Sequence, residues 1–202
     1  MRYELLTIRH KIGAAGPVLE ALGRHFQGAA AQNLLGCWNV EIGELNQILL
    51  LRSFPDPAAA AAERHRLHLD PNLFGCGEHI VSFAADGYAL FPFATAPKPG
   101  KYGAIYEMRS YRLRPGGLAG VLASWAPAVP ERVKRSPMSA LMHTTDGEPR
   151  ITHFWPYPTL EARIATRTQS VKDGIWPPKD GPSHLLDMRS TLLIPTAFSP
   201  MA

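Results

Sequence analysis

The sequence has no long hydrophobic run: no stretch of its 202 residues approaches the roughly 20 consecutive apolar residues that a membrane-spanning helix needs. We therefore expect no membrane span. The first residues also lack the apolar core of a secretory leader, because Arg2, Glu4 and Arg9 are charged and a strand-like pattern begins at Arg2 itself. We expect neither a secretory leader nor a mitochondrial presequence.

Cysteine is scarce, since the chain has only Cys37 and Cys76, far apart and without CxxC or zinc-finger spacing. We interpret both as reduced packing thiols of a cytoplasmic protein. Templates of common enzymes are absent as well: there is no P-loop, no GxSxG elbow, no HExxH and no GxGxxG after a strand. These absences argue against nucleotide enzymes, α/β hydrolases and zinc proteases, and we expect no metal and no cofactor.

Basic residues are only slightly in excess, because 21 Lys and Arg stand against 17 Asp and Glu and the two signs are interspersed along the chain. The one tight basic run, residues 132–135 (RVKR), is typical of the solvated C-terminal end of a helix, where cations are favourable. We therefore expect no nucleic-acid partner. With 46% hydrophobic residues and a net charge of +4, the chain should fold rather than remain disordered.

The chain contains an internal repeat. A shift of 103 residues aligns the Tyr-Glu pair at 3–4 with the pair at 106–107, and residues 90–92 (LFP) with residues 193–195 (LIP). The same shift aligns further glycine, arginine, aspartate and proline residues. Because the shift is constant and close to half of the chain length, the sequence indicates a duplication.

Both halves have the pattern β-α-β-β-α-β. Alternating apolar residues predict strands, and apolar residues three and four positions apart predict helices. The expected strands are 2–9, 35–42, 47–54, 78–93, 104–113, 138–145, 150–157 and 184–194, and the expected helices are 17–32, 57–69, 118–135 and 159–171. Asp56 is the expected N-cap of the second helix. Pro127 and Pro130 should kink or interrupt the third.

This pattern defines the expected fold class. A β-α-β-β-α-β unit forms a ferredoxin-like sheet with two helices on one face and leaves the other face open. We predict an α+β protein of two tandem ferredoxin-like βαββαβ units, residues 1–94 and 102–202, joined by a linker rich in Pro and Gly. The open faces should bury each other, so that the units pack as an α+β barrel and any cavity lies between the two sheets.

The first candidate site is the strand at residues 106–111 (YEMRSY), whose period of two puts Glu107, Arg109 and Tyr111 on one face. Arg109 there would stabilise an anion or enolate, and Glu107 would orient that arginine. A structural ion pair on the sheet is the plainer interpretation. In the first half only the glutamate recurs, as Glu4, which favours a role of the glutamate in the fold.

The second candidate is the strand at residues 151–157 (ITHFWPY), where His153, Trp155 and Tyr157 share one face. Imidazole suits proton transfer near neutral pH, and neighbouring aromatic rings would hold a flat organic ligand. A histidine satisfied within an aromatic core is the alternative. The candidate catalytic residues are thus His153, Arg109 and Glu107, and the candidate ligand-binding residues are Tyr111, Trp155 and Tyr157.

Several of these stretches together resemble the NIPSNAP family. They are residues 106–116 (YEMRSYRLRPG), residues 41–47 (EIGELNQ), and residues 153–157 (HFWPY) followed by Leu160 and Arg163. The resemblance covers nearly the whole chain as two tandem copies. It implies a dimeric α+β barrel, in the superfamily of small cofactor-independent monooxygenases and haem-degrading proteins, and we expect a homo-oligomer. The family has no agreed reaction.

Two functions from different classes follow. The polar and aromatic residues favour a small-molecule-binding or oxygenase-like barrel acting on a hydrophobic or aromatic metabolite. The absence of a nucleophile–base pair and of a metal or cofactor motif favours the alternative, a non-enzymatic oligomeric assembly or protein-interaction module. The first half has Leu50 and Arg52 where the second has His153 and Trp155, so a symmetric pair of sites is not expected.

Overall fold

The computed structural model describes residues 1–202, apart from the side chain of Ala29, and each half follows the expected order of elements. The first half contains β1 (Arg2–His10), α1 (Ala15–His25), β2 (Leu34–Ile42), β3 (Gln47–Phe54), α2 (Pro57–Leu69) and β4 (Ile80–Leu90). The second half contains β5 (Ile105–Leu113), α3 (Gly117–Val133), β6 (Ala140–Thr144), β7 (Arg150–Tyr157), α4 (Leu160–Lys172) and β8 (Leu185–Pro195).

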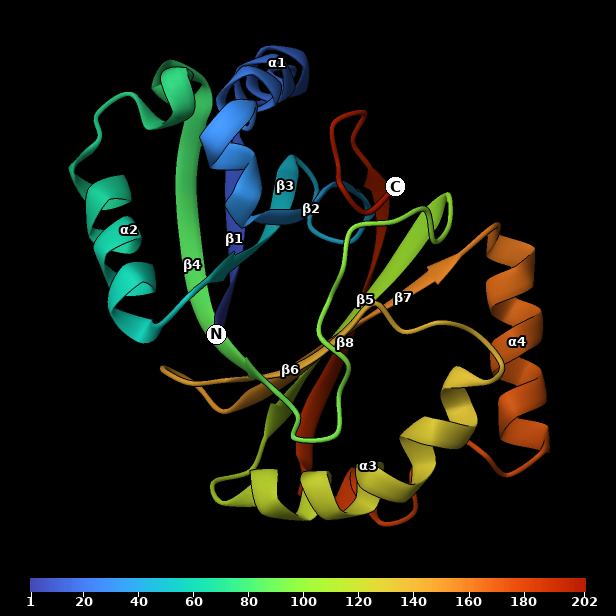
Figure 1. Ribbon diagram of the computed structural model, residues 1–202. Helices are drawn as coiled ribbons and strands as arrows, with labels where there is room; N and C mark the ends of the chain where they lie inside the picture. Colours follow the sequence, from blue (N-terminus) through green and yellow to red (C-terminus); the bar gives the residue numbers. More distant parts are fainter.

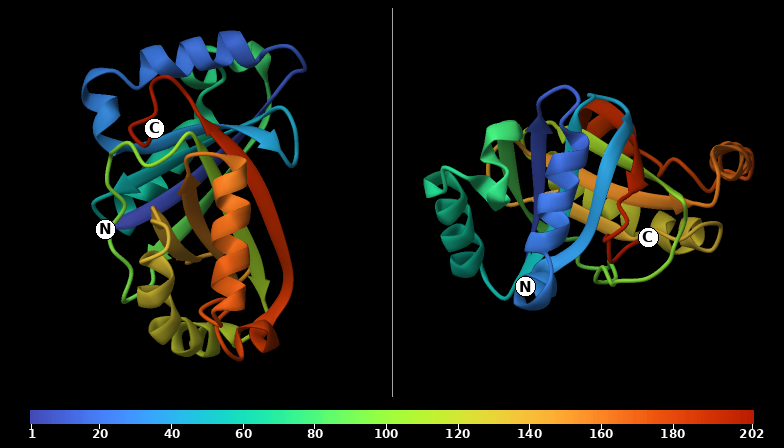
Figure 2. Two further views of the ribbon diagram at one scale, coloured as in Figure 1. Left: turned by 90° about the vertical axis from the view of Figure 1, so that its right-hand side faces the viewer. Right: turned by 90° about the horizontal axis from the view of Figure 1, so that it is seen from above.

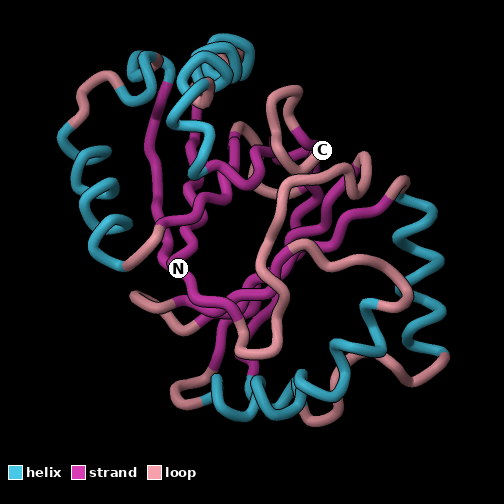
Figure 3. Tube along the Cα trace, in the orientation of Figure 1, coloured by secondary structure: helices cyan, strands magenta, loops and turns pink.

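The eight strands close into one antiparallel barrel in the order β1-β3-β2-β8-β5-β7-β6-β4, and β4 pairs again with β1. Within each half the strand order is the same, β4-β1-β3-β2 and β8-β5-β7-β6. The α-helices lie outside the barrel, with α1 and α2 on one side and α3 and α4 on the other (Figure 1). Figure 3 shows the helices at the periphery and the strands between them. The fold is therefore an α+β barrel.

Most element boundaries agree with the predictions to within two residues, and the differences have local causes. The carboxylate of Asp56 caps α2, as predicted, by accepting a first-turn backbone N–H at 2.8 Å. The first helix is shorter than predicted, because it ends at His25 and a separate 3₁₀ helix begins at Gly28, whose φ is +66°. α3 continues through Pro127 and Pro130 but changes direction along its length (Figure 1). None of the helices in the described part of the chain is long and apolar enough to cross a bilayer.

Side chains from both halves meet in the barrel interior. Trp38 of β2 stacks on Phe154 of β7 with their ring centroids 5.3 Å apart, and its ring lies 5.3 Å from that of Tyr106 in β5. All three residues are fully buried. Gly36 leaves room for the indole, because a Cβ atom there would lie 2.1 Å from the Trp38 ring. Packed aromatic rings therefore fill this part of the interior between the two sheets.

The C-terminal residues complete this interior core. Met201 is fully buried in it, and forms a parallel bridge with Gly100 of the linker. The backbone N–H of Gly100 donates to the carbonyl of Pro200 at 2.9 Å. The linker between the halves and the end of the chain therefore pack together, and Figure 1 shows them side by side.

Both cysteines are free and buried in the first half. Burial raises the pKa of the Cys37 thiol to about 12. This thiol therefore stays protonated at neutral pH, which suits a packing residue and not a nucleophile.

Candidate functional site

The six predicted site residues lie together on the outward face of β5 and β7, beneath α3 and α4. The strand register makes Arg109 the cross-strand partner of His153, and Glu107 the partner of Trp155. The face is directed toward the helices and away from the barrel interior, because the large rings of neighbouring positions, such as Phe154, fill that interior. The two predicted strand faces therefore form one sheet face, and it lies outside the space between the two sheets where any cavity was expected.

Glu107 is the centre of the charged part of this face and is fully buried. Its Oε1 accepts hydrogen bonds from Arg163 Nη2 and Ser190 Oγ, each at 2.6 Å, and lies 3.3 Å from Arg109 Nη1. Arg167 Nη1 lies 3.4 Å from the other carboxylate oxygen. Burial would raise the pKa of Glu107, but the hydrogen bonds and arginine charges outweigh it and lower the pKa below 4.5. Three arginines thus share one ionised carboxylate.

His153 is enclosed by aromatic rings and is fully buried. Its ring centroid lies 5.0 Å from that of Trp125 and 5.1 Å from that of Tyr111, both edge-to-face. The indole N–H of Trp155 donates to His153 Nδ1, which places the proton of a neutral imidazole on Nε2. Nε2 has no hydrogen-bond partner among the residues that the structure describes. Burial, and then the charge of Arg109, lower the pKa of His153 well below 6.5, so the ring is neutral at physiological pH.

This burial predicts a pH dependence of stability. In the unfolded chain His153 binds a proton below about pH 6.5, whereas in the folded protein it stays neutral to a much lower pH. Its stabilising contribution is therefore complete above that pH and is lost as the pH falls below it. From pH 6.5 to about pH 5.5 we expect His153 to reduce the free energy of unfolding by about 1 kcal/mol.

Urea denaturation at the two pH values measures this effect. The decrease in the free energy of unfolding that is due to His153 should disappear in His153→Phe, which keeps an aromatic ring at this position but has no titratable group. It should persist in His65→Phe, a matched change at an exposed position of α2. The same pH dependence in His153→Phe as in the unaltered protein would contradict the prediction.

Arg132 of α3 packs against this face and is only 2% exposed. Its guanidinium group donates to Tyr157 OH and to Ser136 Oγ, both at 3.1 Å. Its guanidinium carbon lies 4.3 Å from the ring centroid of Trp155, in a cation–π contact. The prediction that the basic run 132–135 is solvated is therefore wrong for Arg132, although the two basic residues after it are exposed.

Arg132 is not among the predicted site residues, although the sequence contains a signal for it. Arg132 continues the buried helical stripe of Trp125 and Val129, at spacings of three and four residues, and this stripe faces the sheet. Arg167 had a weaker signal, because the repeat aligns it with Arg64 of the first half. Trp176 had none: it lies in an irregular segment, yet its ring packs 4.9 Å from that of Trp125.

A cavity of about 460 Å³ lies beside this face. The linker, the end of α3 and the start of β6 line it with mostly apolar side chains, including Phe93, Tyr102, Val129, Val133, Met138 and Leu141. α3 connects the cavity to the charged face, because Val129 and Val133 line the cavity while Arg132 between them contacts Trp155. A cavity of this size suits a small organic molecule.

The face combines groups with complementary chemistry. Aromatic rings can hold a flat ligand, and guanidinium N–H groups can stabilise negative charge. In the part of the chain that the structure describes, no group of three or more His, Cys, Asp or Glu side chains is arranged to hold a metal ion. The catalytic and ligand-binding roles of the six residues remain predictions.

The two halves differ on this outward face. Where the second half has Arg109 and His153, the first has Leu6 and Leu50 within an apolar core under α1 and α2. Fold and site together define an eight-stranded α+β barrel protein with a polar and aromatic face in its second half. The sequence profile of the NIPSNAP family matches residues 3–83 and 106–200. The chain therefore belongs to the NIPSNAP family, as the resemblance of its motifs predicted.

Known relatives share moderate similarity with the chain. Protein NipSnap of Drosophila melanogaster is 27% identical over 177 residues, covering 83% of this chain but only 64% of the fly protein. Protein NipSnap homolog 3A of Homo sapiens is 27% identical over 187 residues, covering 85% of this chain and 74% of the human protein. The crystal structure of an anthrone oxidase-like protein has a TM-score of 0.64 at 10% identity, covering 96% of this chain and 91% of that one. At this identity the structural likeness concerns the fold alone.

Proposed function

We propose that this protein is a small-molecule-binding, oxygenase-like α+β barrel that takes a hydrophobic or aromatic metabolite at its second half. The observation that carries the proposal is the asymmetry between the outward faces of the two halves. On the face of the first half, apolar Leu6 and Leu50 lie beside a buried ion pair of Glu4 and Arg52. The second half instead has Arg109, His153 and Trp155 on its face, with the mostly apolar cavity of about 460 Å³ beside them.

The proposal treats residues 1–94 and 102–202 as two tandem ferredoxin-like units. The identical strand order of the halves and the two separate matches to the family profile support this division. The first unit then closes the barrel and buries the open sheet face of the second. The second unit contains the binding site.

Each predicted residue has a distinct role in this site. Arg109 stabilises negative charge on the ligand, and Glu107 holds the guanidinium group of Arg109 in place. Trp155, together with Tyr111 and Tyr157, supplies apolar contact area. His153 is the candidate acid or base: its neutral ring has the proton on Nε2, and Nδ1 accepts a proton only when the indole N–H of Trp155 leaves it. Because aromatic rings enclose it completely, it reaches a substrate only when those rings move.

Binding of a neutral apolar dye tests the proposal. N-Phenyl-1-naphthylamine fluoresces when it is enclosed in an apolar site, and we expect the protein to bind it. Ala94→Trp places a large ring in the cavity and should weaken binding by roughly tenfold or more. Ala58→Trp, at an exposed position of α2, is the matched control and should bind like the unaltered protein. Absence of binding, or equal binding by all three proteins, would overturn the proposal.

A second candidate function is self-association as an assembly module. Exposed apolar side chains on one side of the second half favour it: Ile164 and Val171 of α4 and Leu186 and Met188 of β8 are between 53% and 59% exposed. In the left view of Figure 2, α4 and β8 extend in similar directions. This candidate requires a homo-oligomer, in which a second copy of the chain covers these side chains.

A further inference from the structure

The charged groups beneath α4 are not balanced. The guanidinium groups of Arg109, Arg163 and Arg167 all contact the single carboxylate of Glu107, at 3.3, 2.6 and 3.4 Å. Within the described residues, no other Asp or Glu oxygen lies within 4.0 Å of these three groups. Three positive charges and one negative charge leave this cluster with a net charge of +2.

A fourth guanidinium group adds to the imbalance. Arg132 is almost completely buried, and its hydrogen bonds go to the hydroxyl groups of Tyr157 and Ser136 rather than to a carboxylate. The charges of Arg109, Arg167 and Arg132 all lower the pKa of His153, after burial itself. These cations therefore converge on one region of the sheet, and burying a cation without a counterion is unfavourable.

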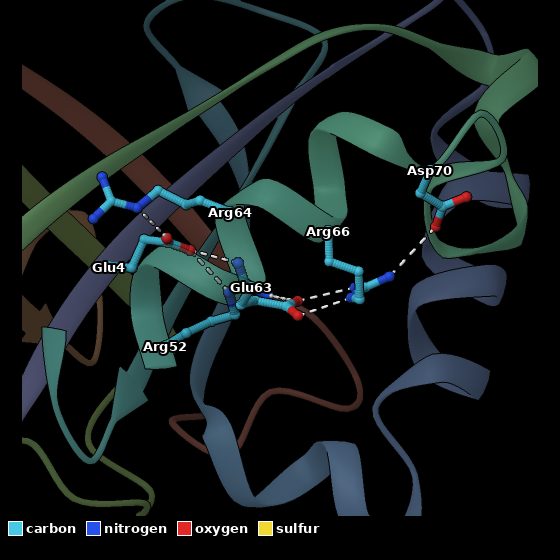
Figure 4. Close-up of polar contacts among 6 residues, drawn as sticks. All are labelled: Glu4, Arg52, Glu63, Arg64, Arg66 and Asp70. Atoms are coloured by element: carbon cyan, nitrogen blue, oxygen red, sulfur yellow. Dashed lines mark hydrogen bonds and ion pairs between the residues drawn. The ribbon is translucent and has the colours of Figure 1, made fainter. Parts of the chain in front are cut away.

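The equivalent region of the first half provides an internal control, because its charges are balanced. Figure 4 shows this cluster, which consists of Glu4, Arg52, Glu63, Arg64, Arg66 and Asp70. It contains three carboxylates and three guanidinium groups, and each guanidinium group has a carboxylate partner. Arg52 Nη1, for example, lies 2.8 Å from Glu63 Oε1. The barrel fold therefore does not itself require an excess of positive charge at this place.

The repeat locates the cause of the difference. Under the shift of 103 residues, the second half adds Arg109 and Arg163 but has Trp155 and Gln169 in place of Arg52 and Arg66, so both clusters have three arginines. The carboxylates make the difference. Glu63 aligns with Thr166, and Asp173, the counterpart of Asp70, pairs with Arg135 instead.

The arginines also have unused hydrogen-bonding capacity. The Nε atoms of Arg109 and Arg163 are buried without a partner among the described residues. Their side chains are nevertheless 14% and 19% exposed, and that of Arg167 is 34% exposed, so the cluster is in contact with solvent. Burial and the charge of Arg109 lower the pKa of Arg167, as expected when cations repel one another.

We propose that the face between β5, β7 and α4 binds an oxyanion, the carboxylate or phosphate group of a small molecule, through Arg109, Arg163 and Arg167. Guanidinium groups form paired, charge-assisted hydrogen bonds with such groups. Glu107 neutralises one of the three charges and leaves two for the ligand. This inference rests on the proposed function for the apolar body of the ligand and for the role of Arg109, and it identifies the negative charge as an oxyanion that Arg163 and Arg167 also bind.

Titration calorimetry at constant chloride concentration tests the inference with three probes: inorganic phosphate, benzoate and neutral benzamide. We expect saturable binding of phosphate or benzoate and not of benzamide at this site. Tighter binding of phosphate indicates a phosphorylated ligand, and tighter binding of benzoate indicates an aromatic acid. Arg163→Ala, which introduces the residue of the first half, should weaken anion binding about tenfold. Arg66→Ala removes an arginine from the balanced cluster and should leave binding unchanged.

Absence of saturable binding of both anions, or binding that Arg163→Ala does not weaken, overturns the inference. Arg163→Lys keeps the positive charge but removes the paired donors, so it should weaken binding even if Arg163→Ala does not fold. The naphthylamine dye separates the two proposals. Dye binding without anion binding overturns the oxyanion site alone, whereas anion binding without dye binding overturns the apolar cavity alone.

Discussion

Replacing Trp38 with alanine is expected to lower the free energy of unfolding by about 3–5 kcal/mol. The indole is fully buried in the barrel interior, where it stacks on Phe154 and contacts Tyr106 from the other half of the chain. Its removal leaves a cavity that neighbouring strands cannot close without breaking their register. Urea denaturation measures the change. Phe93→Ala, an aromatic truncation at a site that is 36% exposed, is the control and should cost much less.

The same variant tests whether the halves unfold together. The three tryptophans that remain, Trp125, Trp155 and Trp176, all lie in the second half, whereas circular dichroism reports on both halves. Because Trp38 of the first half packs against the second, both signals should move to one lower midpoint. If the fluorescence midpoint is unchanged while the dichroism midpoint decreases, the two halves unfold independently. That result would contradict the prediction that they share one core.

Glu107→Gln is expected to destabilise the protein by about 3 kcal/mol. The change removes the one carboxylate that Arg109, Arg163 and Arg167 share, and it leaves three partly buried cations without an anion. Glu148→Gln is the control, because Glu148 pairs with Arg112 at an exposed position, where solvent screens an ion pair and it contributes little to stability. Denaturant titration of the two variants and the unaltered protein measures the difference.

The pH dependence of this effect follows from the lowered pKa of Glu107. A carboxyl group whose pKa is lower in the folded state stabilises the protein above its unfolded pKa of about 4.5, and this contribution is lost as the pH falls further. The difference between the unaltered protein and Glu107→Gln should therefore be complete at neutral pH and decrease below about pH 4.5. A difference that does not change with pH would mean that the glutamine disturbs packing rather than charge.

Local signals predicted the elements of this fold well because they act over a few residues. The Asp56 cap marks the start of α2, and alternation along residues 106–111 predicts that Glu107 and Arg109 share a face. The repeat of 103 residues predicts the common strand order of the halves, since similar sequences form similar units.

Local patterns did not predict which face of β5 and β7 is directed inward. Both faces contain large aromatic residues. Alternation therefore assigns each residue to one of two faces but does not indicate which face is directed into the barrel. The barrel decides the question, because Tyr106 and Phe154 pack against Trp38, which comes from the other half of the chain. Arg109 and His153 are then necessarily directed toward the helices.

The sequence by itself determined the order of the elements, the repeat and the grouping of the six candidate residues, since these depend on periods and spacings along the chain. Only the tertiary structure decided that this group lies under the helices, that Arg132 and Met201 are buried, and that three arginines share Glu107. Those features depend on segments far apart in the sequence that meet when the barrel closes, and no local pattern specifies which side chains will then be neighbours.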